Sequence, residues 1–346
     1  MARNPTKKAR KKPRFTLIKP KPKPIYQAQL TRYPITPFET FKYDFIDYQQ
    51  LENYLKCMET KFPAALKLHV LGESRQGRTI YMAAISNGRR ADDKMAALVE
   101  AGSNGSDSIA IASALFLVDF LSRDRKLAEL TDYYVVPCSN PDAYDRHVKR
   151  QRCGDSAKGD GESIRMHLCN NFPLLLGIVD MDCVGTSEFL AALKTWKSNL
   201  EFDAPTTKAI CKALAVDAPI KLFVSLQENG HFLSYPFGCF PQAFPDEDVK
   251  RAGRFPLCDL EKLNRLRTGS VYQLSGLTFG TVVDYIRLTY DSLKFSYILH
   301  LRDRRVKPRV EDILPYGNDT LKCVKYLARN VFLYYNKDKL KKLDSG

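Results

Sequence analysis

Polar side chains that could bind a metal ion or move a proton occur where several apolar segments end. Six such residues follow or close apolar runs: Asn104, Asp107, Gln227, Glu228, His231 and His300. An oxygen-rich set of this kind suits calcium or magnesium. Polar residues at the ends of strands that face a solvated cleft explain the same pattern, so the residues alone do not establish a metal site.

The cysteines do not add a second candidate site. The chain has nine, at positions 57, 138, 153, 169, 183, 211, 239, 258 and 323. This odd, scattered set contains no paired metal-binding spacing and no disulfide framework, so free thiols in a reducing compartment are expected. Cys169 has no base beside it in the sequence, and we expect a packed thiol there rather than a reactive one.

Helices and strands must position these residues. Apolar residues at helical spacing alternate along the chain with short strand-like apolar runs. Helices are expected at 47–62, 108–124, 187–199, 205–215, 260–268 and 319–335, and strands at 66–72, 79–86, 94–102, 132–137, 220–226 and 295–302. A turn is expected at Ser139–Asp142. Strands that alternate with helices predict an α/β domain, with one large mixed sheet covered on both faces. No apolar run approaches the 18 residues of a membrane span.

The net charge of +15 is concentrated at the N-terminus. Residues 1–38 contain eleven basic and no acidic residues, and the rest of the chain carries only +4. Seven of the 19 prolines also lie before residue 38. Repeated Lys-Pro favours extended polyproline II geometry and cannot build a core, so residues 1–40 are expected to form a solvated basic arm.

The basic run Lys7–Lys12 leaves three interpretations open. It fits a nuclear-import signal or a nucleic-acid contact, and a solvated tail explains it equally well. Under each interpretation the basic arm could attract an anionic partner. No apolar signal segment follows the basic start, so an intracellular protein, cytoplasmic or nuclear, is expected; a misassigned N-terminus would allow an extracellular one.

Six short segments, in order, resemble the carboxypeptidase A-like zinc metallocarboxypeptidases. Gly72–Arg78 is similar to the family's GxSxxGR turn, and Pro137–Tyr144 to its P-x-x-NPDGY segment, with Ala143 in place of glycine. The other four are Leu168–Pro173, the pair Ser225–Gln227 and Ser234–Gly238, Gly269–Gln273, and Leu301–Asp303. The resemblance spans roughly residues 43–335. It implies a three-layer α/β/α fold around one large mixed, twisted sheet.

The resemblance also shows where this chain departs from the family. Zinc in the family is held by a His-x-x-Glu pair and a distant histidine, which leave a position for a reactive water. The matching residues here are Asn104, Asp107 and Gln227. Amide oxygens are poor zinc ligands beside imidazole, so no zinc is expected at these positions. Zinc would be required if the chain were active after all.

Catalytic and substrate positions of the family are also altered. Its general-base glutamate corresponds to His300, which we expect to be a packed histidine. The Asn-Arg pair that grips the substrate carboxylate corresponds to Cys169 and Asn170, without a charge. Arg150 resembles the transition-state arginine, with Arg152 nearly as good a match, and Tyr272 matches the substrate-covering tyrosine.

The sequence therefore predicts a non-catalytic member of the family that binds or scaffolds a peptide or protein tail. The domain is expected at residues 41–336, followed by a short polar tail at 337–346. Two alternatives remain: an active or residually active zinc carboxypeptidase that removes C-terminal residues, and a nuclear or nucleic-acid-associated factor acting through the arm. The sequence does not indicate the oligomeric state, and no membrane span is expected.

Overall fold

The computed structural model describes residues 41–88, 94–153, 170–173, 186–199, 204–240, 246–254, 257–303 and 305–337. The chain divides into two units, Met1–Pro37 and Phe38–Gly346, and all of the described residues belong to the second. The predicted basic arm, the C-terminal tail beyond Lys337, and Cys169 lie outside the described residues.

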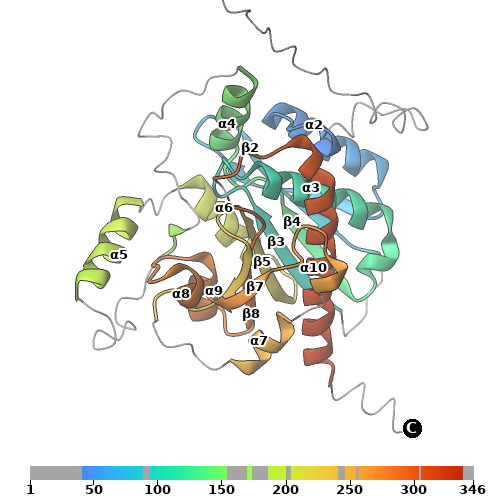
Figure 1. Ribbon diagram of the computed structural model, residues 1–346. Helices are drawn as coiled ribbons and strands as arrows, with labels where there is room; N and C mark the ends of the chain where they lie inside the picture. The colour runs from blue at the N-terminus through green and yellow to red at the C-terminus, as the bar shows by residue number, and fades with distance from the viewer. Residues whose placement is uncertain are drawn as a thin grey trace, which may run out of the picture. The chain divides into compact units, whose positions relative to one another are not determined.

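The domain is built on a mixed sheet of eight strands (Figure 1). The strands are β1 (Leu66–Glu73), β2 (Thr79–Ile85), β3 (Met95–Ala101), β4 (Thr131–Val136), β5 (Ile220–Gln227), β6 (Phe232–Tyr235), β7 (Arg267–Ser270) and β8 (Phe295–His300). Their order is β1-β2-β4-β3-β5-β8-β6-β7. The central strands β4, β3, β5 and β8 are parallel to one another. Their carboxyl ends therefore lie at one edge of the sheet.

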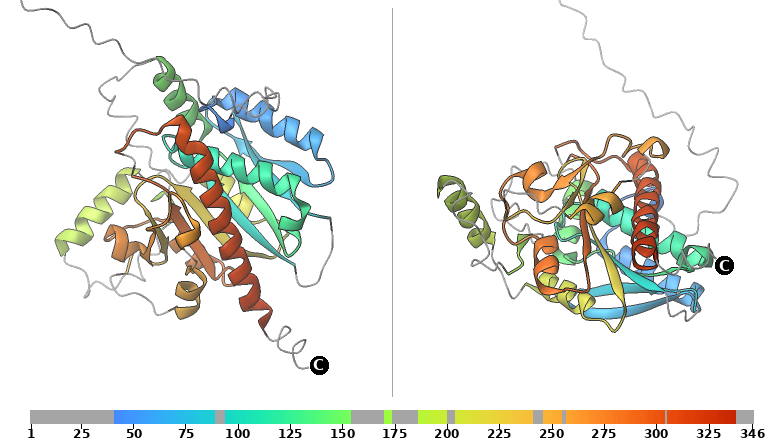
Figure 2. Two further views of the ribbon diagram at one scale, coloured as in Figure 1. Left: turned by 45° about the vertical axis from the view of Figure 1, so that its right-hand side comes forward. Right: turned by 90° about the horizontal axis from the view of Figure 1, so that it is seen from below.

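Helices on one face of the sheet enclose the larger core. They are α2 (Tyr48–Lys61), α3 (Ser108–Arg123), α4 (Pro141–Cys153), α7 (Glu247–Ala252) and α10 (Ile313–Tyr335). Helix α2 begins with a capping box in which Asp47 and Gln50 satisfy each other's backbone N–H groups. Helix α3 is buried along nearly its whole length, and α10 runs beside it (Figure 2). The long apolar run at 108–118 is explained by this position between the sheet and α10.

A second core covers the opposite face of the sheet. It is formed by α6 (Pro205–Leu214) and α9 (Val282–Thr289), which pack on strand residues such as Leu98 and Phe223. A smaller aromatic cluster lies around Trp196 of α5 (Thr186–Asn199), close to the short helix α8 (Val271–Ser275). Three single turns complete the described elements, at Arg125–Ala128, Leu257–Asp259 and Val310–Asp312. The predicted three-layer α/β/α architecture is confirmed.

The predicted helix at 260–268 is wrong. This segment is a turn followed by β7, although buried leucines recur in it at helical spacing. Its backbone N–H groups at Glu261, Lys262 and Leu263 all donate to the carboxylate of Asp319 on α10, at 2.6–3.1 Å. A side chain from another element thus takes the place of the helical hydrogen bonds.

One helix, α4, was not predicted, and one helix boundary differs from the expectation. The predicted turn at Ser139–Asp142 is the start of α4, because the Asn140 side chain accepts the N–H of Ala143 and Pro141 occupies the first helical position. Helix α10 begins six residues before the predicted 319, since its first turn tolerates Pro315. Among the described residues, no helix is both long and apolar enough to span a membrane.

Candidate functional site

The predicted polar residues meet at the carboxyl edge of the central strands. Asn104 and Asp107 occupy the loop between β3 and α3, Gln227 ends β5, and His300 ends β8. Gln227 and His300 are direct partners in the parallel pairing of β5 with β8. All four side chains are buried. The fold therefore brings together the positions that the sequence singled out.

Asp107 connects the loop after β3 to the end of β5. Its Oδ2 atom accepts a hydrogen bond from the Asn104 amide at 3.3 Å and another from the backbone N–H of Glu228 at 3.2 Å. Asp107 is also the residue before α3, yet its side chain does not cap that helix. The carboxylate that corresponds to a metal ligand in the family is thus directed to protein N–H groups.

Glu228 caps α3 from outside the helix. Its Oε1 atom accepts the backbone N–H groups of Ile109 and Ala110 at 2.5 and 3.2 Å, and its Oε2 atom pairs with Arg302 at 2.5 Å. Glu228 is 0% exposed and Arg302 is 6% exposed. A carboxylate at a helix N-terminus is stabilised by the helix dipole, and the guanidinium supplies a counter-charge. This buried pair joins α3, β5 and the segment after β8.

Burial affects the titration of Glu228. Removal from water and the neighbouring Asp107 carboxylate raise the pKa of Glu228 to about 7, and the Arg302 guanidinium and the helix N–H groups offset this only in part. A carboxyl whose pKa is higher in the folded than in the unfolded state stabilises the fold at low pH. This contribution is lost as the pH rises from the ordinary pKa of a glutamate towards the raised pKa.

Gln227 belongs to a chain of hydrogen bonds beneath this pair. Its Nε2 atom donates to Ser225 Oγ at 3.1 Å, and that hydroxyl donates to Glu100 at 2.8 Å. Glu100 also accepts from the Ser139 hydroxyl at 2.7 Å and the Ser103 N–H at 3.1 Å. Burial raises the pKa of Glu100, and these donors oppose the rise. The side chain at the former histidine position is therefore held within the sheet.

His300 is packed rather than exposed to a reaction centre. Its ring lies 4.1 Å from the ring of Phe232, centroid to centroid, and its Nε2 atom is 3.5 Å from the Ser234 hydroxyl. Both neighbours are on β6, the antiparallel partner of β8. His231 lies in a different region. Its neighbours there are the Lys262 backbone, with which it makes a hydrogen bond, and the Asp319 carboxylate. These two histidines do not converge on one position.

The predicted substrate residues lie on three separate elements. Arg150 is half-buried on α4, and Tyr272 is half-buried on α8. The guanidinium of Arg152 contacts Asp47, Gln50 and the carbonyl of Phe45 at 2.9–3.0 Å, at the start of α2.

Asn170 is half-buried in the short described stretch 170–173. That stretch lies beside Gly280, whose carbonyl accepts the Phe172 N–H, and a Cβ at Gly280 would lie 2.5 Å from the Asn170 carbonyl oxygen. The position of Asn170 thus depends on the close approach between its backbone and that of Gly280.

Two of the segments that carry the resemblance bind each other. Asp142 accepts the Ser74 hydroxyl, the Gln76 N–H and the Arg78 guanidinium at 2.7–3.1 Å. Arg78 reaches Asp145 as well, at 2.8 Å. The turn between β1 and β2 is thereby tied to the first turn of α4. These retained motif residues connect two elements of the fold. Their contacts given above do not include Asn104, Asp107, Gln227 or His300.

The glycine after Asn104 permits a close approach between two loops. A Cβ at Gly105 would lie 2.3 Å from the Cβ of Ala143 and 2.4 Å from its carbonyl carbon. Ala143 is the residue that replaces the family's glycine. The methyl group gained at Ala143 therefore occupies space that only a glycine at 105 leaves open.

The residues present do not fit a catalytic zinc ion. Such a site needs three ligands, usually imidazole or carboxylate, and an open fourth position. Here two of the three corresponding side chains are amides, and the only carboxylate, Asp107, accepts two protein N–H groups. Within the part of the chain that the structure describes, no three His, Cys, Asp or Glu side chains gather as a metal site would require.

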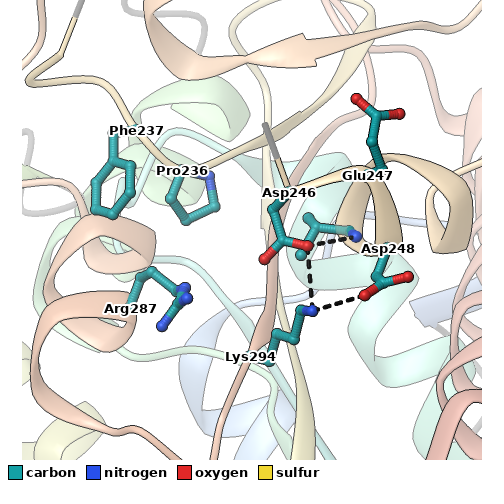
Figure 3. Close-up of a pocket in the computed structure, with 8 residues that line it drawn as sticks. Pro236, Phe237, Asp246, Glu247, Asp248, Arg287 and Lys294 are labelled. Carbon is teal, nitrogen blue, oxygen red and sulfur yellow. Dashed lines mark hydrogen bonds and ion pairs between the residues drawn. The ribbon is translucent and has the colours of Figure 1, made fainter. Parts of the chain in front are cut away.

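A separate pocket of about 500 Å³ opens where β6 ends (Figure 3). Lys294 reaches the carboxylates of Asp246 and Asp248 there, at 3.2 and 2.9 Å, and the side chains of Phe237 and Arg287 line another part of the wall. None of the predicted site residues lines this pocket. Asp246 and Asp248 thus share one lysine, and the third acidic lining residue, Glu247, pairs with Lys250 at 2.7 Å.

The fold and the retained motifs identify the class to which this protein belongs. The chain is a member of the zinc carboxypeptidase family, peptidase M14, and the match extends over residues 51–323. Mouse carboxypeptidase A1 is 20% identical over 317 residues, which cover 85% of this chain and 72% of the mouse protein. Carboxypeptidase B of Astacus astacus is 22% identical over 297 residues, covering 82% and 96%.

Solved structures agree with this fold. Thrombin-activatable fibrinolysis inhibitor superposes with a TM-score of 0.69 at 18% identity, covering 88% of this chain and 79% of that one. Carboxypeptidase A from Helicoverpa armigera gives a TM-score of 0.67 at 16% identity, covering 88% and 78%. At this identity the superpositions show a shared architecture and nothing about the reaction.

Sequence reasoning missed the buried partners of the predicted positions. Glu100, Ser139 and Ser225 were not recognised as a hydrogen-bonded group, and the pairing of Glu228 with Arg302 was not predicted. Glu100 carried one visible signal, because it is a single charged residue inside the apolar run 95–101. The other contacts join strands that are far apart in the sequence, and no local pattern reveals them.

Proposed function

We propose that this protein is a non-catalytic member of the zinc carboxypeptidase family that binds a peptide or protein tail. The observation that carries this proposal is the hydrogen bonding of the three former ligand positions. Asp107 accepts two N–H groups, Asn104 donates to Asp107, and Gln227 donates into the Glu100 chain. Two of the three side chains are amides, whose weakly basic oxygens are poor zinc ligands, and the one carboxylate already accepts two protein N–H groups.

The state of the general-base position supports the same conclusion. A base must reach the proton that it removes, directly or through one water. His300 is instead buried against Phe232 and close to Ser234. Without an activated water beside it, a histidine here has no proton-transfer task in peptide hydrolysis.

Peptide recognition uses groups other than the metal. Arg150 and Tyr272 are both half-buried, so each keeps some access to a ligand. Arg150 occupies the position that resembles the family's transition-state arginine, and we assign it as the residue that receives a ligand carboxylate. A planar guanidinium suits a carboxylate through two parallel hydrogen bonds.

The first experiment measures zinc content and C-terminal trimming of the purified full-length chain. We expect no stoichiometric zinc and no chelator-sensitive release of C-terminal residues from peptides with aromatic, aliphatic or basic ends. The quadruple variant Asn104→His/Asp107→Glu/Gln227→His/His300→Glu serves as a comparison for metal uptake. Stoichiometric zinc with chelator-sensitive trimming in the natural chain would overturn the proposal.

The second experiment measures binding of fluorescent peptides that carry either a free carboxylate or an amide at the C-terminus. The free carboxylate is expected to bind more tightly, and Arg150→Ala is expected to remove the difference. Arg152→Ala is the matched control, because it removes the same charge two residues away. Equal binding of both peptides, or an equal effect of both substitutions, would contradict a role for Arg150.

A further inference from the structure

A groove of about 410 Å³ lies between α10 and the start of β4, away from the site described above. One wall is α10, with Lys322, Lys325 and Arg329. The other wall is the turn before β4, with Lys126 and Leu130. The first residue of β4 lines the groove, so the groove belongs to the amino edge of the parallel strands, opposite the carboxyl edge that holds the candidate site.

The groove carries a marked excess of positive charge. Its lining includes four basic residues, Lys126, Lys322, Lys325 and Arg329, and a single acidic residue, Glu129. All five are exposed. Lys322 donates to a backbone carbonyl, that of Asp259, and among the described residues no ion pair involves the other three cations. The charge is therefore not neutralised within the described part of the domain.

The three cationic side chains on α10 lie in a row and repel one another. Lys322 and Lys325 are three residues apart, and Lys325 and Arg329 are four apart, so the side chains are neighbours on one helix face. Like charges at these spacings destabilise a helix, whereas alternating charges would stabilise it. An anionic ligand in the groove would relieve this repulsion.

The base of the groove is apolar. It includes Tyr133, Ala328 and Phe332, and Leu130 stands at its rim with 51% of its surface exposed. Leu130 does not belong to the main core cluster. An exposed leucine beside an apolar floor and a charged rim is the arrangement found at protein-binding surfaces.

We propose that this groove binds an acidic peptide segment of a partner protein, with an apolar side chain inserted between Leu130 and Phe332. Carboxylates on either side of that side chain would pair with Lys126, Lys325 and Arg329. The chain's own N-terminus does not fit, because residues 1–38 contain eleven basic and no acidic residues. The proposal is independent of the peptide-binding cleft under Proposed function, since the groove shares no residue with that site.

The features of the groove favour a peptide over a nucleic acid. Single-stranded nucleic acids bind along extended basic surfaces on which bases stack on exposed aromatic faces. Of the three aromatic residues that line this groove, Tyr133 is buried and Tyr326 and Phe332 are half-buried, and Glu129 lies among its cations. A mixed acidic and apolar peptide satisfies both the floor and the rim.

The test measures fluorescence anisotropy of a short labelled peptide in which glutamates surround one leucine, with the full-length chain. Companion peptides replace either the leucine by serine or the glutamates by glutamine. The first variant, Lys325→Glu/Arg329→Glu, reverses two charges of the groove. Its control is Lys194→Glu/Lys197→Glu on α5, which makes the same charge change at two exposed lysines far from α10 (Figures 1 and 2).

A second pair of variants tests the apolar contact. Leu130→Ser removes the exposed leucine at the rim, and Leu190→Ser on α5 removes a leucine of similar exposure, 56%. Because both residues are exposed, neither substitution is expected to unfold the domain. Circular dichroism melting checks this for every variant, and Lys325→Gln/Arg329→Gln replaces the charge reversal if that variant fails to fold.

The expected results are binding of the acidic peptide that weakens with salt, a loss of about tenfold or more in Lys325→Glu/Arg329→Glu, and a smaller loss in Leu130→Ser. Both α5 controls keep the affinity of the natural chain. The proposal is overturned if no binding occurs, or if the groove variants bind like their controls. It is also overturned if the groove variants lose affinity for an oligothymidylate or an anionic vesicle but not for the peptide.

Discussion

The buried pair between Glu228 and Arg302 gives the sharpest test of how the domain is held together at its candidate site. Arg302→Met removes the guanidinium and keeps a flexible side chain of similar length. The Glu228 carboxylate then stays wholly buried, with only the Ile109 and Ala110 N–H groups as partners. The perturbation thus isolates the contribution of the counter-charge.

The magnitude follows from the burial of both partners. Removing one partner of a buried ion pair costs about 3–5 kcal/mol, because the other charge is left without compensation. Glu228 can take up a proton, since burial places its pKa at about 7 and the loss of Arg302 raises the pKa further. The destabilisation is therefore expected to be larger at pH 8 than at pH 6. At about 2 °C per kcal/mol, the Tm at pH 8 falls by about 6–10 °C.

The assay is thermal and urea unfolding of the natural chain and the variants at pH 6 and pH 8. The matched control is Arg305→Met, three residues away, because the Arg305 side chain is 91% exposed and pairs with the partly exposed Asp303. An exposed pair contributes little, so this control is expected to leave the Tm nearly unchanged. The double variant Glu228→Gln/Arg302→Met removes both charges and should recover most of the lost stability.

Two results would refute this reasoning. The first is a Tm for Arg302→Met at pH 8 that is no lower than the Tm of Arg305→Met. The second is a double variant that is as unstable as Arg302→Met alone. Either result would mean that the buried carboxylate does not depend on its guanidinium, and that the packing around α3 alone holds the loop.

Three further predictions concern other contacts. Arg78→Leu should lower the free energy of unfolding by about 1.5–3 kcal/mol in urea, because it removes charge-assisted hydrogen bonds to Asp142; an unchanged urea midpoint would exclude this tie. Gly105→Ala should lower it by about 1–3 kcal/mol, with partial recovery in Gly105→Ala/Ala143→Gly, and no recovery would argue against that contact. Burial raises the pKa of Asp284 to about 6, so a Tm measured across pH should fall as pH rises from about 4 to about 6, less steeply in Asp284→Asn; equal slopes would contradict this.

Much of the architecture was predictable because its elements are long and regular. The buried strands at 95–101 and 220–227 and the apolar helix at 108–123 have patterns that arise from burial on both sides. The order of the retained motifs then indicated a three-layer architecture around one mixed sheet. Elements built by contacts between distant segments were not predictable in this way.

The segment around Leu263 illustrates why the remaining fold could not be predicted. Leucines at 260, 263 and 266 are buried and have helical spacing, yet the backbone amides there bind a carboxylate from α10, and no helix forms. The short helices α7, α8 and α9 were missed because each has too few turns to show a periodicity. Tertiary contacts decide the structure of such segments.

The candidate site was likewise predictable only in part. The positions Asn104, Asp107, Gln227 and His300 were found from the sequence because motif order fixes their register. What each side chain contacts was not available, since the contacts cross from β3 to β5 and from β5 to the end of β8. The sequence showed which chemical groups had changed, and the structure adds what holds the new groups in place.

The cap that Glu228 provides for α3 links Asp107, which stands at a zinc-ligand position of the family, to the stability of that helix. Asp107 accepts the Glu228 N–H, and Glu228 in turn accepts the first N–H groups of α3. A substitution that turned the 107 side chain towards a metal would release the backbone of residue 228 and disturb that cap. Substitutions that restore a ligand are therefore coupled to the stability of the helix beside it. A substitution that introduces a metal ligand at position 107 is therefore expected to destabilise α3 unless a second substitution compensates for it.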